Sequence, residues 1–120
     1  MNEIWGRPAR PLQYAKAIAN SDLPSGVRAT CWALATFADN ETGLAWPSVK
    51  KLSEAAGLSR AVVSKHTTLA EAKGYLRKDR RYNGSIFYTI TIPVGAENRD
   101  DIRALEQLMQ EAPQTRGLQS

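Results

Sequence analysis

Residues 48–73 read SVKKLSEAAGLSRAVVSKHTTLAEAK. Two runs in this stretch repeat apolar residues with helical spacing, and Gly-Leu-Ser at residues 57–59 separates them. Ser48 stands just before the first run and the serine of the Gly-Leu-Ser turn just before the second, where a side-chain oxygen caps a helix. The glycine suits the left-handed residue that ends many helices. We therefore predict helices over 49–56 and 59–73 with the tight turn of a helix-turn-helix.

The pattern after residue 74 changes from helical to strand-like. Residues 75–81 and 86–92 form two runs, of which the second is rich in β-branched and aromatic residues. Asn83-Gly84 lies between them and is a strong hairpin signal, because a type I′ turn needs positive φ at both central residues. The sequence predicts a two-stranded β-hairpin with a type I′ turn.

The chain before residue 48 predicts two further helices and a short strand. A helix is expected over 13–20, and a second from Ser25, as its N-cap, to about residue 39. Residues 44–46 are short and apolar, as in a brief strand. Helix, strand, helix, turn, helix and hairpin in this order indicate an α+β, mostly helical fold, a winged helix-turn-helix domain over 13–96.

The two ends of the chain are expected to lie outside this domain. Residues 1–12 contain two Arg-Pro pairs and are predicted as an extended arm, either one that reaches the DNA minor groove or a disordered lead-in. Residues 97–111 predict an additional helix, and 112–120 a flexible tail. That helix carries an apolar stripe of Ile102, Leu105, Leu108 and Met109. The stripe packs on its own domain or joins two copies, and we favour a homodimer.

The positive charge of the chain is concentrated in its middle. The 120 residues carry a net charge of +4. Residues 44–92 hold nine Lys or Arg against three Asp or Glu, whereas residues 1–43 are neutral and 93–120 have a net charge of −2. A basic segment of this kind is typical of a protein that binds a polyanion. A solvated basic surface is the other interpretation.

Composition also limits the chemistry and the location that we expect. Cys31 and His66 are the only residues of their types, too few for a histidine or cysteine metal cluster or for a nucleophile and base pair. We therefore expect a protein that is not an enzyme, with no catalytic residues, no metal and no cofactor. The N-terminus lacks the apolar run of a signal peptide, and no stretch is long and apolar enough for a membrane span. A cytoplasmic, nucleoid-associated protein with no membrane contact is expected.

One part of the chain resembles a known family. The residues that carry the resemblance are Ala45-Trp46-Pro47-Ser48, Leu52, Gly57-Leu58-Ser59-Arg60, Val63 and Gly74-Tyr75-Leu76. Together they resemble the helix-turn-helix domain of phage and plasmid replication-initiation proteins, over roughly residues 14–92. The resemblance implies binding to double-stranded DNA. The sequence departs from the family in having Thr67 and Ala70 where larger apolar residues are usual, and we expect no replication or helicase-loading domain within these 120 residues.

The candidate DNA-binding residues come from three places. The start of helix 49–56 can hold a phosphate, helix 59–73 is the recognition helix for the major groove, and the basic wing at 77–86 can follow the backbone. On the recognition helix Lys65 suits guanine, and no Asn or Gln is present to read adenine. The predicted residues are Ser48, Lys50, Lys51, Ser59, Arg60, Ala61, Ser64, Lys65, Thr68, Arg77, Lys78, Arg80, Arg81 and Asn83.

The sequence favours a double-stranded DNA-binding protein that acts in transcription regulation or as an origin-binding factor in DNA replication of a phage or plasmid. Two alternatives stay open. One is a segregation, excision or architectural module with weak sequence preference. The other is a winged helix that contacts a partner protein. His66 is expected to have a structural or partner-contact role. Trp32 and Trp46 are expected in a core or an interface rather than as platforms on which bases stack.

Overall fold

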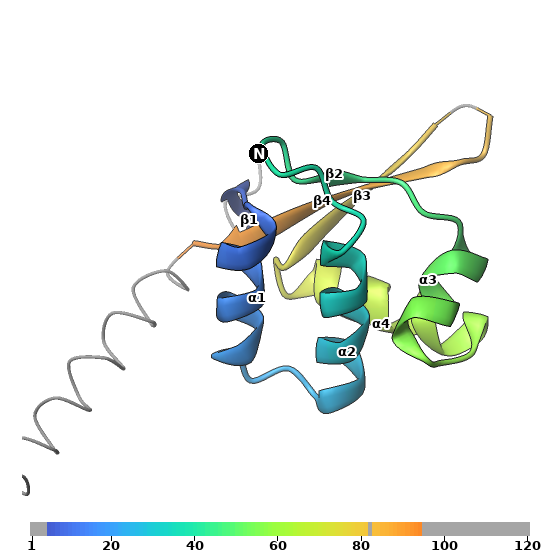
Figure 1. The fold of residues 1–120 in the computed structure, drawn as a ribbon, viewed down its shortest axis with the longest axis horizontal. Coiled ribbons are helices and arrows are strands. Elements are labelled where there is room, and N and C mark those ends of the chain that lie inside the picture. The colour runs from blue at the N-terminus through green and yellow to red at the C-terminus, as the bar shows by residue number, and fades with distance from the viewer. Residues whose placement is uncertain (1–4, 82, 95–120) are drawn as a thin grey trace, which may run out of the picture.

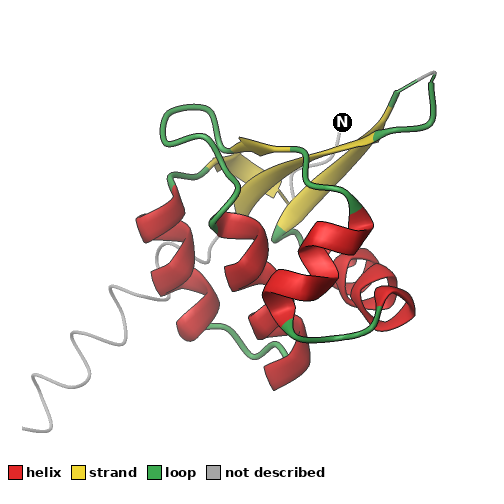
Figure 2. Cartoon of the chain, turned by 45° about the vertical axis from the view of Figure 1, so that its right-hand side comes forward, coloured by secondary structure: helices red, strands yellow, loops and turns green. Residues whose placement is uncertain are grey.

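The computed structural model describes residues 5–81 and 83–94. In this part of the chain four helices lie to one side of an antiparallel sheet (Figures 1 and 2). The helices are α1 (Pro11–Ala19), α2 (Ser25–Ala35), α3 (Val49–Ala56) and α4 (Arg60–Ala72). The α+β class is therefore confirmed. The predicted helix over 97–111, its stripe of Ile102, Leu105, Leu108 and Met109, and the tail lie outside the described residues.

The sheet is built around one long strand. β4 (Ile86–Pro93) pairs antiparallel with β3 (Leu76–Arg80) on one edge. On its other edge it pairs with β2 (Leu44–Ala45) and β1 (Trp5–Pro8). The sheet is thus larger than the predicted two-stranded wing, because β4 is longer than β3 and its backbone groups have partners on both edges. The protruding end of the β3–β4 hairpin, seen in Figure 2, is the wing.

The N-terminal segment is part of the sheet and not a free arm. Residues 5–8 form β1, and the Ala9 N–H donates to the Ile90 carbonyl at 2.9 Å. Helix α1 begins at Pro11, two residues earlier than predicted, since proline fits the first helical position, where no N–H is needed. Residues 5–8 are extended as expected, but they pair with β4 and are not a free arm, and residues 11–12 belong to α1. Residues 1–4 lie outside the described part.

The helix-turn-helix has the predicted caps. The Ser48 hydroxyl oxygen accepts a hydrogen bond from the Lys51 N–H at 3.1 Å, and that of Ser59 from the Val62 N–H at 3.2 Å. Gly57 has φ of +73°, the left-handed conformation expected after α3. These three residues set where α3 ends and α4 begins. The predicted bounds of both helices agree with the structure to within one residue.

Helix α2 is shorter than predicted. Its N-cap is Pro24, so Ser25 is the first helical residue, and the helix ends at Ala35 and not near residue 39. The Asp39 carboxylate accepts hydrogen bonds from the N–H groups of Glu41 and Thr42 at 3.0 and 2.8 Å. The bond from the Thr42 N–H is the main cause that lowers the pKa of Asp39. This local turn competes with a further turn of helix.

The wing turn differs from the predicted type I′ turn. Gly84 has φ of +92°, but Asn83 does not have a positive φ. The loop is closed by the Gly84 N–H on the Arg81 carbonyl at 2.9 Å and the Arg81 N–H on the Ser85 carbonyl at 2.8 Å. The Asn83 amide oxygen accepts from the Ser85 N–H and hydroxyl, so its side chain supports a longer loop with one left-handed glycine.

One core joins the helices to the sheet. Tyr14 is fully buried, and its hydroxyl donates to the Tyr75 carbonyl at 2.6 Å. Burial raises the pKa of Tyr14 and raises that of the Cys31 thiol to about 11, so Cys31 is a protonated core residue. The largest fully buried apolar side chains are Tyr14, Ile18, Leu34, Leu52, Leu76 and Ile90. They come from α1, α2, α3 and the hairpin.

Candidate nucleic-acid interface

Helix α4 separates its side chains by face as predicted. Val63, Thr67 and Ala70 are buried beneath the helix. The candidate contact residues Ala61, Ser64, Lys65 and Thr68 are all exposed, as are Ser59 and Arg60 at the helix start. The outward face is therefore small, polar and basic. Such a face can approach the edges of base pairs closely.

The inner side of α4 is held against α2 by His66. The Thr30 hydroxyl lies 3.1 Å from His66 Nδ1. Gly26 of α2 makes room for the ring, since a Cβ at that position would lie 2.7 Å from His66 Cε1. Both contacts indicate a structural role for His66. Leu69 of α4 is 37% exposed.

The wing is tied to α4 by Lys78. Its ammonium group donates to the Thr68 hydroxyl at 3.0 Å, and its backbone N–H donates to the Glu71 carboxylate at 2.9 Å. Burial lowers the pKa of Lys78, and the neighbouring Glu71 raises it. These bonds set the position of the wing relative to the exposed face of α4. The bond of Glu71 to Lys78 could not be predicted from the sequence, because the chain turns between these two residues, which are seven positions apart.

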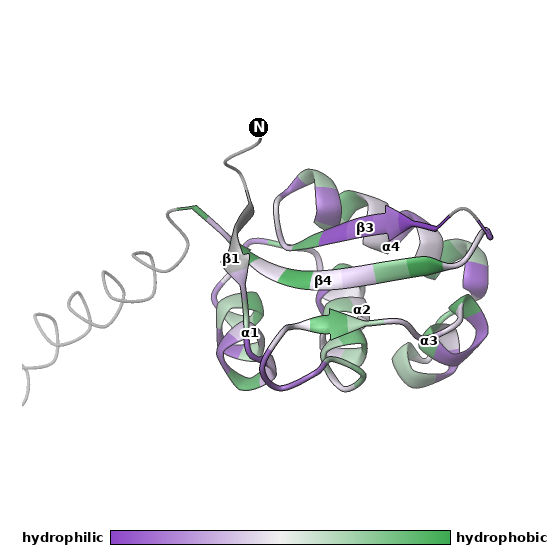
Figure 3. Ribbon diagram, turned by 90° about the horizontal axis from the view of Figure 1, so that it is seen from above, coloured by the Kyte–Doolittle hydropathy of each residue, from purple (hydrophilic) through white to green (hydrophobic). Residues whose placement is uncertain are grey.

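The basic wing residues lie on two opposite faces of the hairpin. Side chains alternate along a strand, so Lys78 and Arg80 of β3 share the face that turns toward α4. Arg77 lies on the other face, where its Nε is 3.3 Å from a carboxylate oxygen of Asp79. Arg81 is on that face too, with its guanidinium carbon 3.8 Å from the centre of the Phe87 ring. Viewed from above, β3 is hydrophilic along most of its length (Figure 3).

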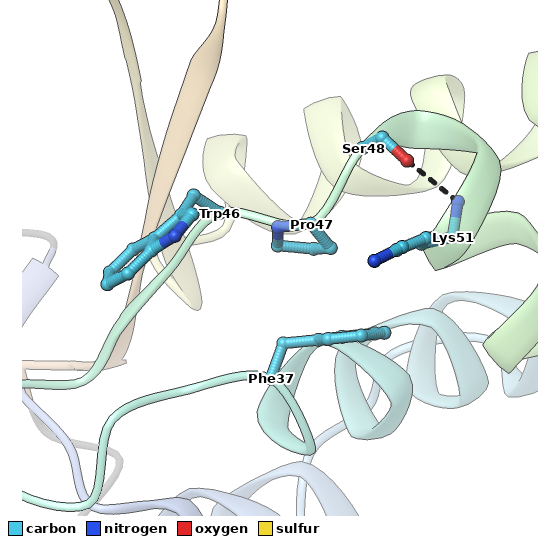
Figure 4. Close-up of a pocket in the computed structure, with 5 residues that line it drawn as sticks. All are labelled: Phe37, Trp46, Pro47, Ser48 and Lys51. Carbon is cyan, nitrogen blue, oxygen red and sulfur yellow. Dashed lines mark hydrogen bonds between the residues drawn. The ribbon is translucent and has the colours of Figure 1, made fainter.

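The predicted contact residues at the start of α3 lie on a different helix from the exposed face of α4. Ser48, Lys50 and Lys51 are exposed at the start of α3. Figure 4 shows the Lys51 side chain beside the Phe37 ring and Pro47, in a pocket that Trp46 and Ser48 complete. At the wing tip, Asn83 is exposed and Ser85 occupies its amide oxygen. Trp46 is 62% exposed, which contradicts a core position, whereas the expected alternative, a position in an interface, stays a prediction.

Within residues 5–81 and 83–94, no three His, Cys, Asp or Glu side chains come together as metal ligands. No helix in the same part of the chain is long and apolar enough to cross a membrane.

Comparison with known proteins agrees with the fold. Residues 21–76 match the family model described as a helix-turn-helix domain. One solved structure, "N-Terminal domain of DNA binding protein", superposes with a TM-score of 0.57 at 18% sequence identity. The match covers 77% of this chain and 82% of that one. No curated protein sequence matches the chain. Residues 21–76, which include α2, α3 and α4, are thus similar to a helix-turn-helix domain, and the helical part of the fold agrees with that likeness.

Proposed function

We propose that this protein binds double-stranded DNA, with α4 in the major groove and the wing on the neighbouring backbone. The observation that carries the proposal is the exposed face of α4. It consists of small or polar side chains with Lys65 at its centre and Arg60 at its start. A protein-binding helix would be expected to expose aromatic or large apolar residues there.

The wing supplies the backbone contacts in this proposal. Lys78 and Arg80 lie on the face of the hairpin that turns toward α4, and Lys78 is bonded to Thr68 of that helix. A duplex against α4 would therefore bring its phosphates close to Arg80. Phosphate contacts of this kind position a protein and carry no sequence information directly. Lys65, Ser64 and Thr68 would supply the base contacts.

The biological role that we propose is that of a transcription regulator or an origin-binding factor of a phage or plasmid. The resemblance of residues 14–92 to replication-initiation proteins supports it. A segregation or architectural module would bind many sequences about equally, so the sequence preference distinguishes the two roles. Homodimerisation through 97–111 remains a prediction, which sedimentation of the full chain at micromolar concentration would test.

The salt dependence of duplex binding tests the wing. We expect Arg80→Ala to weaken binding to all duplexes and to reduce the slope of log K against log salt by about 0.9, as for one lost phosphate contact. Arg10→Ala is the matched control. Arg10 is an exposed arginine at the N-cap of α1, and it belongs neither to α4 nor to the wing. Its slope should equal that of the parent protein. Equal slopes for Arg80→Ala and the parent would remove the wing from the interface.

A further inference from the structure

A groove runs beside the start of α3, between this helix and strand β4 of the wing. It consists of two adjoining hollows of about 360 and 380 Å³, which share Trp46, Pro47 and Ser48. Phe37 and Lys51 complete the first hollow (Figure 4), and wing residues that include Phe87 line the second. We call this feature the Trp46 groove. The proposed contacts of α4 with DNA leave it unused.

Aromatic rings form the walls of the Trp46 groove. The Trp46 and Phe87 ring centres are 5.7 Å apart at an interplanar angle of 40°. Trp46 is 62% exposed and Phe37 is 37% exposed. Tryptophan is highly buried on average, so an indole this exposed beside two other aromatic rings points to a binding surface.

The charges around the groove favour an anionic occupant. Among the described residues that line the two hollows, none carries a carboxylate. Lys51 lies in the first hollow, and the Arg81 guanidinium stacks on Phe87 at the edge of the second. Asp79 is the acidic neighbour on the same face of the wing, and it is 3.3 Å from Arg77. The groove therefore combines exposed aromatic faces with two cations.

We infer that the Trp46 groove binds an unpaired DNA strand, with bases stacked on Trp46 and Phe37 and phosphates near Lys51 and Arg81. Aromatic platforms lined by cations are the chemistry that holds single strands, because every base has a face that can stack. A closed duplex keeps its base faces covered and could not use Trp46 in this way. The inference rests on the proposed function: the duplex lies on α4 and the unpaired strand lies in the groove beside α3.

The test compares a blunt duplex with the same duplex carrying a single-stranded tail of about ten nucleotides, on either the 5′ or the 3′ end. Fluorescence anisotropy with the full chain should show tighter binding of one tailed form. Trp46→Ala should lose about tenfold in affinity for that form, the effect of one stacked base, and nothing for the blunt duplex. Trp46→Phe, which keeps a stacking ring, should retain most of the affinity.

One control variant and three distinct outcomes make the result decisive. Leu12→Ala removes another exposed apolar side chain, 72% exposed on α1, and should leave the binding of both DNAs unchanged. If the parent binds tailed and blunt duplexes equally and Trp46→Ala changes neither, the strand site is excluded while the duplex site stands. Failure of the parent to bind any duplex would instead count against the proposed function. If Trp46→Ala alters only self-association, the groove is a protein interface and the inference is overturned.

Discussion

Replacing Leu34 with alanine is expected to lower the free energy of unfolding by about 2–5 kcal/mol, the cost of a cavity left by a buried leucine. Leu34 is fully buried in α2, the helix that packs against α1, α3 and α4. The loss would be a large fraction of the 5–15 kcal/mol that typically stabilises a domain. Denaturant unfolding followed by circular dichroism measures it directly.

The same variant separates stability from binding. Leu34 has no exposed surface, so it cannot touch DNA in the folded protein. At low temperature, where the variant is still folded, its affinity for duplex should equal that of the parent. Leu12→Ala, at a 72% exposed position, should change the free energy of unfolding by no more than about 0.5 kcal/mol. A similarly small loss for Leu34→Ala would mean that the core is not packed as described.

Lys65→Ala is expected to weaken binding to a preferred duplex by about 1–3 kcal/mol, the value of one good base contact. Lys65 is exposed in the middle of α4, one helical turn after Ala61 and about one before Thr68. The variant should also discriminate less between the preferred and a scrambled sequence, because a lost base contact affects the two unequally. Competition binding at fixed salt measures both effects.

The Arg10→Ala protein is again a suitable control, since it removes an exposed cation from α1. Its discrimination should match that of the parent. A Lys65→Ala protein that bound all sequences more weakly by one common factor would place Lys65 on the phosphate backbone. A variant with unchanged affinity and discrimination would place the duplex away from α4.

The helix-turn-helix could be predicted because its signals are local. Ser48, Gly57 and Ser59 each act within a few residues of chain, and the periodicity of Val63, Thr67 and Ala70 places the inner face of α4 correctly. The coarse order of the elements follows from the same kind of signal. Cap chemistry and helical spacing were sufficient for this part of the fold.

The parts that could not be predicted depend on contacts between distant residues. The pairing of β1 with β4 joins residues more than 80 positions apart in the sequence. The two Arg-Pro pairs predict extended backbone, but they do not indicate which strand it pairs with. The end of α2 was predicted too late in the chain, because the apolar residues Phe37 and Ala38 continue the helical spacing. In the structure the Asp39 side chain forms a turn with Thr42 instead. The prediction of the wing turn was wrong because the loop closes from the Gly84 N–H to the Arg81 carbonyl, and the Asn83 side chain bonds to Ser85.

The candidate site shows the same division. Exposure of the α4 residues was predictable from spacing, whereas the face of the wing that turns toward α4 is known only from the contact of Lys78 with Thr68. Strand alternation alone would have separated Lys78 and Arg80 from Arg77. The contact of Arg81 with Phe87 and the nearness of Trp46 required the folded hairpin.

The most direct test is the anisotropy of a labelled duplex, taken from the DNA that flanks this protein's own coding region, against a scrambled duplex at several salt concentrations. We expect binding to both that weakens as salt rises, with tighter binding to the flanking sequence. Equal affinities would point to the architectural or segregation role. No binding to either duplex at low salt would contradict the proposal that α4 and the wing form a DNA interface.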